Sequence, residues 1–186
     1  EILVKILKNI DSEYTVVEIE QAVYDGGKKT PAVKVYDKSL PEGSPLLTEG
    51  TDYTLAYTTN EGGDPTKPNY VNANSYNDDV VIQGIGLYYG SVTGTFVINQ
   101  RPLTDAQTIV TVNTPLTYNG ADQNVTVTVQ YDNGIDPAFT IDAANYDFEP
   151  KTVKEVGQHN IVITAIDNSN LTGNITKVMQ VTNGFA

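Results

Sequence analysis

Apolar and polar residues alternate with a period of two through most of the chain, and the 3.6-residue period of an amphipathic helix is almost absent. The alternating segments are rich in Val, Ile, Thr and Tyr, which suit a pleated, half-buried surface. Residues 142–147 fit either a helical turn or a short strand. We predict strands at Tyr14–Ile19, Val33–Tyr36, Tyr53–Tyr57, Val80–Ile85, Thr93–Ile98, Thr108–Val112, Val125–Tyr131, Asn160–Ile166 and Ile175–Val181.

Turn-forming residues separate these segments, as at Asp25-Gly26-Gly27, Asn119-Gly120 and Asp132-Asn133-Gly134. Short strands at this spacing, without a long helical stretch, are typical of β-sandwiches. The pattern therefore predicts an all-β protein.

An internal repeat sets the expected number of domains. Tyr24-Asp25-Gly26 recurs 94 residues later as Tyr118-Asn119-Gly120, and Val33-Lys34-Val35 falls at the same offset on Val127-Thr128-Val129. The seam lies near residue 100, where Pro102 ends one strand before another begins. We predict two sandwiches, residues 11–100 and 101–186, joined end to end as a semi-rigid rod. Residues 1–10 are either an extra first strand or the last strand of a preceding repeat.

The charge balance excludes several partners. Lys and Arg number 11 against 23 Asp and Glu, which gives a net charge of -12, and phosphate binding needs clustered cations. No apolar run approaches the roughly 18 residues of a membrane span. The absence of cysteine excludes disulfides, thiolate zinc sites and a cysteine nucleophile. We expect no nucleic-acid partner and no membrane insertion.

Three motifs carry a family resemblance. Tyr24-Asp25-Gly26, Gly50-Thr51-Asp52-Tyr53 and Gly84-Ile85-Gly86-Leu87-Tyr88-Tyr89-Gly90 resemble the bacterial immunoglobulin-like repeats of large cell-surface proteins. Those repeats open on Tyr-x-Gly, carry Gly-Thr-Asp-Tyr in the middle and close on Gly-x-Gly-x-Tyr-x-Gly. The second copy keeps Tyr118-Asn119-Gly120 but has Ala165-Ile166-Asp167 in place of the Gly-x-Gly step.

The resemblance implies two tandem immunoglobulin-like β-sandwiches in an extracellular protein that is secreted or attached to the cell surface. It carries over no catalytic residues, so we expect a protein that is not an enzyme. The expected function is a monomeric spacer, stalk or adhesion scaffold whose partners are neighbouring domains of the same polypeptide.

The alternative function is binding of a host or environmental glycan or protein. The first copy has an Asn- and Tyr-rich insertion at residues 69–79, and tyrosine rings stack on sugars while Asn and Asp bond their hydroxyls. The candidate ligand-binding residues are Tyr70, Tyr76, Tyr88 and Tyr89.

Calcium is the candidate metal, because hard cations take oxygen ligands from Asp and Asn loops. The candidate ligands are Asp132, Asn133, Asp136 and Asp167, and ordinary Asx turns are the competing interpretation. His159 is interpreted as a surface histidine. An amide bond between a lysine and an Asn or Asp is a further alternative for stabilising the sandwiches, and Lys5, Lys34 and Asn99 have suitable residue types.

Overall fold

The computed structural model describes residues 6–41, 45–57, 70–73, 78–134 and 136–184. The protein is all-β, as the alternation predicts, and the helical element among these residues is a short 3-10 turn at Ala143–Asn145. The chain divides into two compact units. Unit 1 comprises residues 1–22 and 28–98, and unit 2 comprises residues 23–27 and 99–186. The division at residue 98 lies close to the expected seam, but the transfer of residues 23–27 to unit 2 was not predicted.

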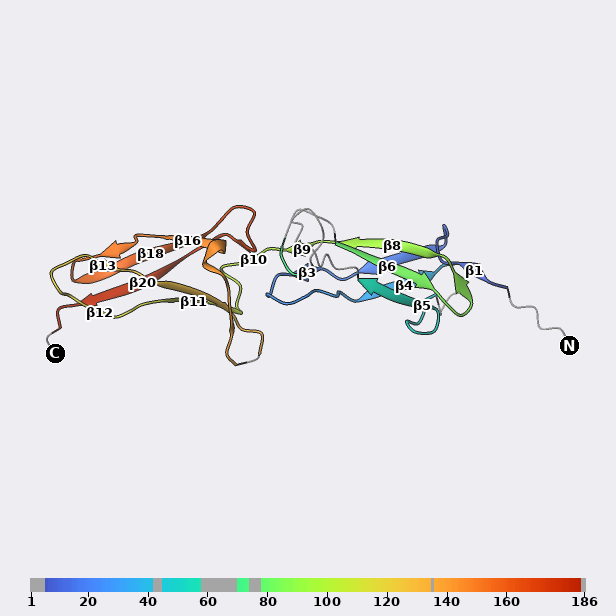
Figure 1. The fold of residues 1–186 in the computed structure, drawn as a ribbon, viewed down its shortest axis with the longest axis horizontal. Helices are drawn as coiled ribbons and strands as arrows, with labels where there is room; N and C mark the ends of the chain where they lie inside the picture. The colour runs from blue at the N-terminus through green and yellow to red at the C-terminus, as the bar shows by residue number, and fades with distance from the viewer. Residues whose placement is uncertain (1–5, 42–44, 58–69, 74–77, 135, 185–186) are drawn as a thin grey trace. The chain divides into compact units, whose positions relative to one another are not determined.

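Unit 1 is built from antiparallel strands and one short parallel pair. The strands β5, β6 and β8 form one antiparallel sheet (Figure 1). Strand β2 pairs antiparallel with β4, and β1 pairs parallel with β7. The division between the units falls within β3 and β9. The strands are β1 (Lys8–Asn9), β2 (Thr15–Ile19), β3 (Ala22–Val23), β4 (Val33–Asp37), β5 (Tyr53–Tyr57), β6 (Asp78–Gly84), β7 (Tyr88–Tyr89), β8 (Ser91–Phe96) and β9 (Ile98–Asn99).

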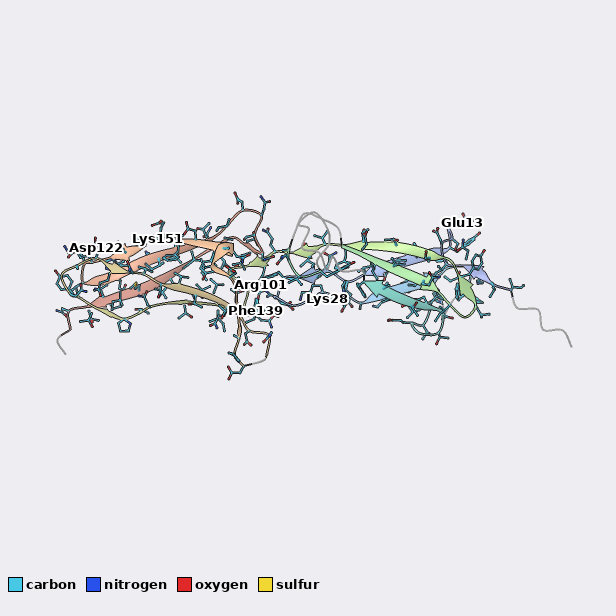
Figure 2. All side chains as sticks on the ribbon, in the orientation of Figure 1. Glu13, Lys28, Arg101, Asp122, Phe139 and Lys151 are labelled. Carbon is cyan, nitrogen blue, oxygen red and sulfur yellow. The ribbon has the colours of Figure 1, made fainter. Side chains whose placement is uncertain are left out.

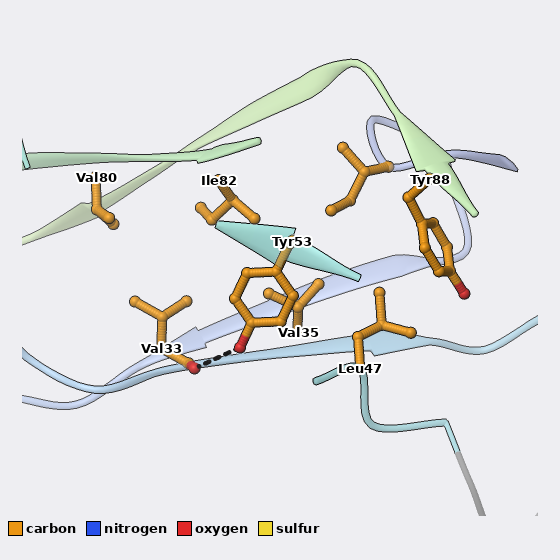
Figure 3. Close-up of a cluster of buried hydrophobic side chains, with 8 residues drawn as sticks. Val33, Val35, Leu47, Tyr53, Val80, Ile82 and Tyr88 are labelled. Carbon is orange, nitrogen blue, oxygen red and sulfur yellow. Dashed lines mark hydrogen bonds between the residues drawn. The ribbon is translucent and has the colours of Figure 1, made fainter. Parts of the chain in front are cut away.

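The core of unit 1 lies between the β2–β4 pair and the β5–β6–β8 sheet. Val33 and Val35 of β4 pack in one cluster with Tyr53 of β5 and with Val80 and Ile82 of β6 (Figure 3). Alternate residues of each strand face this cluster, because successive side chains of a strand point to opposite faces. Burial of each such side chain stabilises the unit by roughly 1.5–3 kcal/mol. Two sheets enclosing one core are consistent with a β-sandwich.

Unit 2 has a four-stranded sheet in the order β12-β20-β18-β16 and a three-stranded sheet in the order β11-β14-β15. β10 pairs parallel with β19, and β12 pairs parallel with β20. Its strands are β10 (Arg101–Pro102), β11 (Thr108–Val112), β12 (Leu116–Thr117), β13 (Gln123–Asn124), β14 (Val127–Tyr131), β15 (Phe139–Thr140), β16 (Tyr146–Glu149), β17 (Thr152–Val153), β18 (Gly157–Ala165), β19 (Leu171–Thr172) and β20 (Asn174–Thr182). Its core includes Val129, Ile161, Ile163, Met179 and Val181, all fully buried.

The same strand pairings occur in both units. Ile19 pairs with Val33 in unit 1 as Val112 pairs with Val127 in unit 2, and both pairs close a five-residue antiparallel register. The Tyr53 hydroxyl donates to the Val33 carbonyl at 3.2 Å, and the Tyr146 hydroxyl donates to the Val127 carbonyl at 3.2 Å. Matching registers and matching side-chain bonds therefore accompany the sequence offset.

Residues near the N-terminus belong to unit 1. Lys8 and Asn9 pair with Tyr88 and Tyr89, and Ile10 is fully buried in the unit 1 core. Of the first ten residues, 1–5 lie outside the described part of the chain. Lys8 and Asn9 thus form a first strand of this unit, whereas the assignment of residues 1–5 to this strand or to a preceding repeat stays a prediction.

Candidate functional site

Unit 1 contains a group of polar side chains around the buried Asp37. We call this group the Lys8 cluster and define it as Lys8, Asp37, Ser39 and Tyr88. Lys8 comes from β1, Asp37 ends β4, Ser39 lies in the turn after β4, and Tyr88 comes from β7. Lys8 and Tyr88 are 29 and 51 positions from Asp37 in sequence, and the strand pairing brings them together with Asp37 and Ser39.

Asp37 is the acceptor at the centre of the Lys8 cluster. Its carboxylate accepts hydrogen bonds from the Lys8 ammonium at 2.8 Å, the Tyr88 hydroxyl at 2.9 Å, the Ser39 hydroxyl at 2.6 Å and the Ser39 amide at 2.8 Å. Its side chain is 5% exposed, whereas that of Lys8 is 37% exposed. The bond to the Ser39 amide forms an Asx turn, which ends β4 locally.

The hydrogen bonds decide the ionisation of Asp37. Burial alone raises the pKa of a carboxyl, but the bonds from Lys8, Ser39 and Tyr88 outweigh burial and hold the pKa of Asp37 well below its ordinary value of 3.8. Burial, together with the bond to the Asp37 carboxylate, raises the pKa of the Tyr88 phenol above its ordinary value of 10.0. The cluster is therefore a carboxylate surrounded by donors at neutral pH.

This arrangement fixes strands and favours no reaction among its members. Condensation of a lysine with an aspartate needs a neutral amine and a protonated carboxyl, whereas Lys8 and Asp37 form an ion pair. Of the lysines predicted for an amide bond, Lys5 lies outside the described residues and Lys34 is exposed on β4 opposite Glu18. The Lys8 cluster ties β1 and β7 to the end of β4.

Unit 2 has a buried cation at the corresponding position, which we call the Arg101 cluster: Arg101, Tyr131, Asp105, Tyr24 and Phe139. Arg101 is 5% exposed, and its guanidinium carbon lies 3.8 Å from the centre of the Tyr131 ring. Its Nε donates to the Tyr24 carbonyl at 2.7 Å, and its Nη1 lies 3.2 Å from the Asp105 Oδ1. A guanidinium stacked on an aromatic face is a favourable cation–π contact.

The structure gives two of the four predicted ligand-binding tyrosines a different role. Tyr70 is fully buried and Tyr88 is 8% exposed, so neither presents a ring face on which a sugar could stack. Tyr89, next to Tyr88 on β7, is 50% exposed because neighbouring residues of a strand face opposite sides. Tyr76 lies outside the described residues.

Tyr70 is part of an aromatic group in unit 1. Its ring stacks on Phe96 with centroids 5.9 Å apart and meets the Tyr57 ring edge-on at 6.2 Å. Its hydroxyl donates to the Asp79 carbonyl. These contacts place Tyr70 in the core, and its polar atom is satisfied by the backbone.

The four candidate calcium ligands are exposed loop residues of unit 2. The Asp132 carboxylate accepts a hydrogen bond from the Gly134 amide at 2.9 Å, which is an Asx turn. Asn133 lies inside that turn, Asp136 precedes Pro137, and Asp167 follows β18. Within the described part of the chain, no group of three or more His, Asp or Glu side chains is placed to hold a metal ion.

His159 lies on β18 opposite Met179 and is partly exposed. Its Nε2 lies 2.6 Å from the Glu155 carbonyl oxygen, which is a local backbone contact. In the described ranges we find no helix with the length and apolar character needed to cross a membrane.

Sequence reasoning did not identify the Lys8 cluster or the Arg101 cluster. A signal for Asp37 is present, because Val33, Val35 and Asp37 occupy successive inward positions of one strand and the third is polar. Tyr131 occupies the matching inward position of β14. The partner of either residue comes from a distant strand, and no local pattern points to it.

Comparison of the chain with protein-family models, curated proteins and solved structures finds no match.

Proposed function

We propose that the chain consists of two tandem immunoglobulin-like β-sandwiches that act as a non-catalytic spacer or adhesion scaffold in an extracellular bacterial surface protein. The observation that carries this proposal is the repetition of one set of strand pairings in both units, down to the matched bonds of Tyr53 and Tyr146. A repeated module suits a structure that spans distance. The resemblance of three motifs to bacterial cell-surface repeats supports the location.

The use of polar groups supports a structural role. Asp37 and Arg101, the most buried charged residues of the described chain, are satisfied by internal partners. The hydroxyls of Tyr53, Tyr70, Tyr88 and Tyr146 bond within the fold. Buried donors and acceptors that already have partners stabilise a fold and leave little polar capacity for a substrate.

We expect the parallel pairing of early and late strands to make unit 2 resist tension. β10 pairs with β19 and β12 with β20, both parallel, so opposite forces on the two ends of the unit shear the pairs. Bonds loaded in shear share the force, whereas bonds at the end of a zipper break one at a time. Hydrogen bonds also link the two segments around β12, including Tyr118 amide to Thr182 carbonyl at 2.7 Å and Gln180 amide to Thr114 hydroxyl at 2.9 Å.

Net charge supports a module whose separate copies associate only weakly. The charge of -12 on 186 residues opposes association between copies at low salt. It also keeps a protein soluble when it is held at high local density on a surface.

The proposal is tested by stretching single molecules held at their two ends. Two independent sandwiches should unfold in two separate events, and each should release roughly 90 residues, or about 300 Å of extended chain. A single event, or a gradual extension without a force peak, would contradict a spacer made of two independent units. The Asp37→Ala variant identifies which event belongs to unit 1, because only that event should move to lower force.

Binding through residues 69–79 is the competing function, and a glycan array separates it from the spacer. We expect no binding by the natural chain. Binding that disappears in Tyr76→Ala or Tyr89→Ala, but persists in Tyr14→Ala, would replace the spacer proposal. Tyr14 is a suitable control because its ring is 51% exposed, close to the 50% of Tyr89.

A further inference from the structure

The turn Tyr24-Asp25-Gly26 belongs to unit 2, although residues of unit 1 flank it in sequence. Tyr24 is 5% exposed. Its amide donates to the Asn99 carbonyl at 2.9 Å, its carbonyl accepts from Arg101 Nε at 2.7 Å, and its ring meets the Phe139 ring edge-on at 6.5 Å. Figure 2 labels Arg101 and Phe139 in unit 2. The residues of unit 2 that contact this turn form its docking surface, which we call the acceptor of the turn.

Gly26 makes the close fit of this turn possible. Its φ of +81° favours glycine, and a Cβ at this position would lie 2.3 Å from the Phe139 ring. Any other residue would displace Phe139 or the turn. The Tyr-x-Gly sequence thus combines a ring that packs on the acceptor with a glycine that lets the backbone approach it.

Tyr118-Asn119-Gly120 has the same construction but is not covered. The Tyr118 amide donates to Thr182 as that of Tyr24 donates to Asn99, and Asn119 accepts from the Ala121 amide at 3.0 Å as Asp25 accepts from Gly27 at 2.9 Å. Gly120 has a φ of +78°, and a Cβ there would meet no described atom within 4 Å. Tyr118 is 41% exposed. The second turn has the shape of the first, without an acceptor in the described part of this chain.

The N-terminal end of unit 1 has the features of an acceptor. The β1–β7 pair corresponds to the β10–β19 pair, so Lys8 stands where unit 2 has Arg101. Asp37 and Ser39 take two of the three N–H groups of Lys8, and the ammonium end remains partly exposed. Within or beside the β1–β7 pair lie apolar residues that are at least half exposed: Ile6, Leu7, Leu87 and Tyr89. A group of exposed apolar residues beside a cation is typical of a protein-binding surface.

We propose that the Tyr118–Gly120 turn of one chain docks on the N-terminal end of unit 1 of a second copy, head to tail. The inference rests on the proposed function, because it treats the two units as copies of one sandwich. The Tyr118 carbonyl accepts the remaining Lys8 N–H, as the Tyr24 carbonyl accepts from Arg101. Pro45 stands at the position of Phe139, so the contact to Gly120 is less tight than the contact to Gly26.

Docking of a single turn is weak between separate molecules, since the area is small and each copy carries a charge of -12. A covalent link supplies an effective concentration in the millimolar range. The equivalence of the two units shows where two copies can be joined. Val181 corresponds to Ile98 and Ile6 corresponds to Asn99, and Ile98 and Asn99 are consecutive in the chain. A fusion of residues 1–181 to residues 6–186 therefore keeps the natural spacing between a last strand and the next first strand.

The experiment measures nitration of Tyr118 by tetranitromethane in this fusion and in the single chain. Tyr118→Phe in the second copy ensures that the signal comes from the first copy. We expect Tyr118 reactivity to fall at least fivefold in the fusion, while Tyr14 of the first copy, which is exposed and takes no part in the joint, keeps its reactivity. Ile6→Ser with Leu7→Ser in the second copy should restore the reactivity, and Val178→Ser, a matched exposed apolar site, should not.

Unchanged Tyr118 reactivity in the fusion would overturn the proposal. So would a fall that Ile6→Ser with Leu7→Ser does not reverse, because another surface would then cover the turn. If the fusion folds poorly, the natural chain is diluted from about 1 mM in about 0.5 M salt, which screens the charge. Amide resonances of Tyr118–Ala121 and of Lys8 should then shift together, and fixed resonances would also overturn docking. Two unfolding events of the single chain would still support the proposed function, so the two failures are distinguishable.

Discussion

Units 1 and 2 place a cation at the same point of the same strand pairing and give it different partners. In unit 1, Lys8 pairs with the Asp37 carboxylate at 2.8 Å. In unit 2, Arg101 lies 3.8 Å from the centre of the Tyr131 ring. Asp37 and Tyr131 occupy matching positions, opposite Thr15 and Thr108. One backbone position therefore accepts an ion pair or a stacked ring.

The difference follows from the chemistry of the two cations. A guanidinium is planar and weakly hydrated, so it stacks on an aromatic ring, whereas an ammonium is a compact charge that needs oxygen acceptors. The carboxylate beside Lys8 in turn needs donors, and Tyr88 and Ser39 supply them. In unit 2, Leu171 stands at the position of Tyr88, where no such donor is required. Unit 1 consequently depends on a network whose members must be retained together.

The largest expected effect is that of Asp37→Ala. This change leaves the Tyr88 hydroxyl and the Lys8 ammonium without their acceptor, and we expect the free energy of unfolding of unit 1 to fall by about 3 kcal/mol. Hydrogen exchange of the Val35 and Ile82 amides measures it. Asp147→Ala is the control, because Asp147 and Lys151 form an exposed pair in unit 2, and loss of an exposed pair changes the free energy of unfolding far less than loss of a buried one. Equal losses in Asp37→Ala and Asp147→Ala would show that burial of the Lys8 cluster does not add to the stability of unit 1.

Acid should reproduce part of this loss in unit 1. The folded-state pKa of Asp37 is depressed, so its contribution is complete above the ordinary carboxyl pKa of about 4 and is lost as pH falls toward the folded value. Protonated Asp37 keeps some hydrogen bonds, so the loss should be smaller than in Asp37→Ala. The free energy of unfolding of unit 1 at pH 7, 4 and 2.5 measures this loss, and the Asp37→Asn variant is the reference. If the stability of the Asp37→Asn variant falls with acid as much as that of the natural chain, protonation of Asp37 does not cause the loss.

Arg101→Lys should destabilise unit 2 by about 1–2 kcal/mol. A lysine loses the planar stack on Tyr131 and the Nε bond to the Tyr24 carbonyl. The reciprocal change Lys8→Arg should cost less, because a guanidinium also pairs with a carboxylate. Urea unfolding of both variants compares the two positions. A greater cost for Lys8→Arg would mean that the two sites do not differ as their chemistry indicates.

The smallest expected effect is the same in both units. Tyr53→Phe and Tyr146→Phe each remove one hydroxyl that donates to a strand carbonyl at 3.2 Å, and each should cost about 1 kcal/mol. Urea unfolding of each variant gives the two values. Costs that differ by more than about 1 kcal/mol would argue against the equivalence of the units.

Strand positions follow from the sequence with little error, because alternation reports which side chains are buried. β5 and β11 have the predicted limits, Tyr53–Tyr57 and Thr108–Val112. Residues 142–147 contain both predicted structures in succession, a 3-10 turn and the start of β16. The two-residue strands β7, β10 and β19 were not predicted, since two residues contain no period and exist as strands only through their partners.

The candidate sites show where local patterns are insufficient. Tyr70 and Tyr89 were both predicted to bind a ligand, yet one is fully buried and the other is 50% exposed. Their difference arises from the Tyr57 and Phe96 rings that cover Tyr70 and from the outward side of β7 that Tyr89 occupies.

The sequence by itself determined the all-β class, most long strands and the position of the seam, because these depend on periodicity and on turn residues that act locally. Only the tertiary structure decided that Asp37 lies beside Lys8, that Arg101 stacks on Tyr131, and that the Tyr24 turn belongs to unit 2. These contacts join residues from 29 to 77 positions apart. Burial and pairing of distant strands establish them, and no local pattern encodes such a meeting.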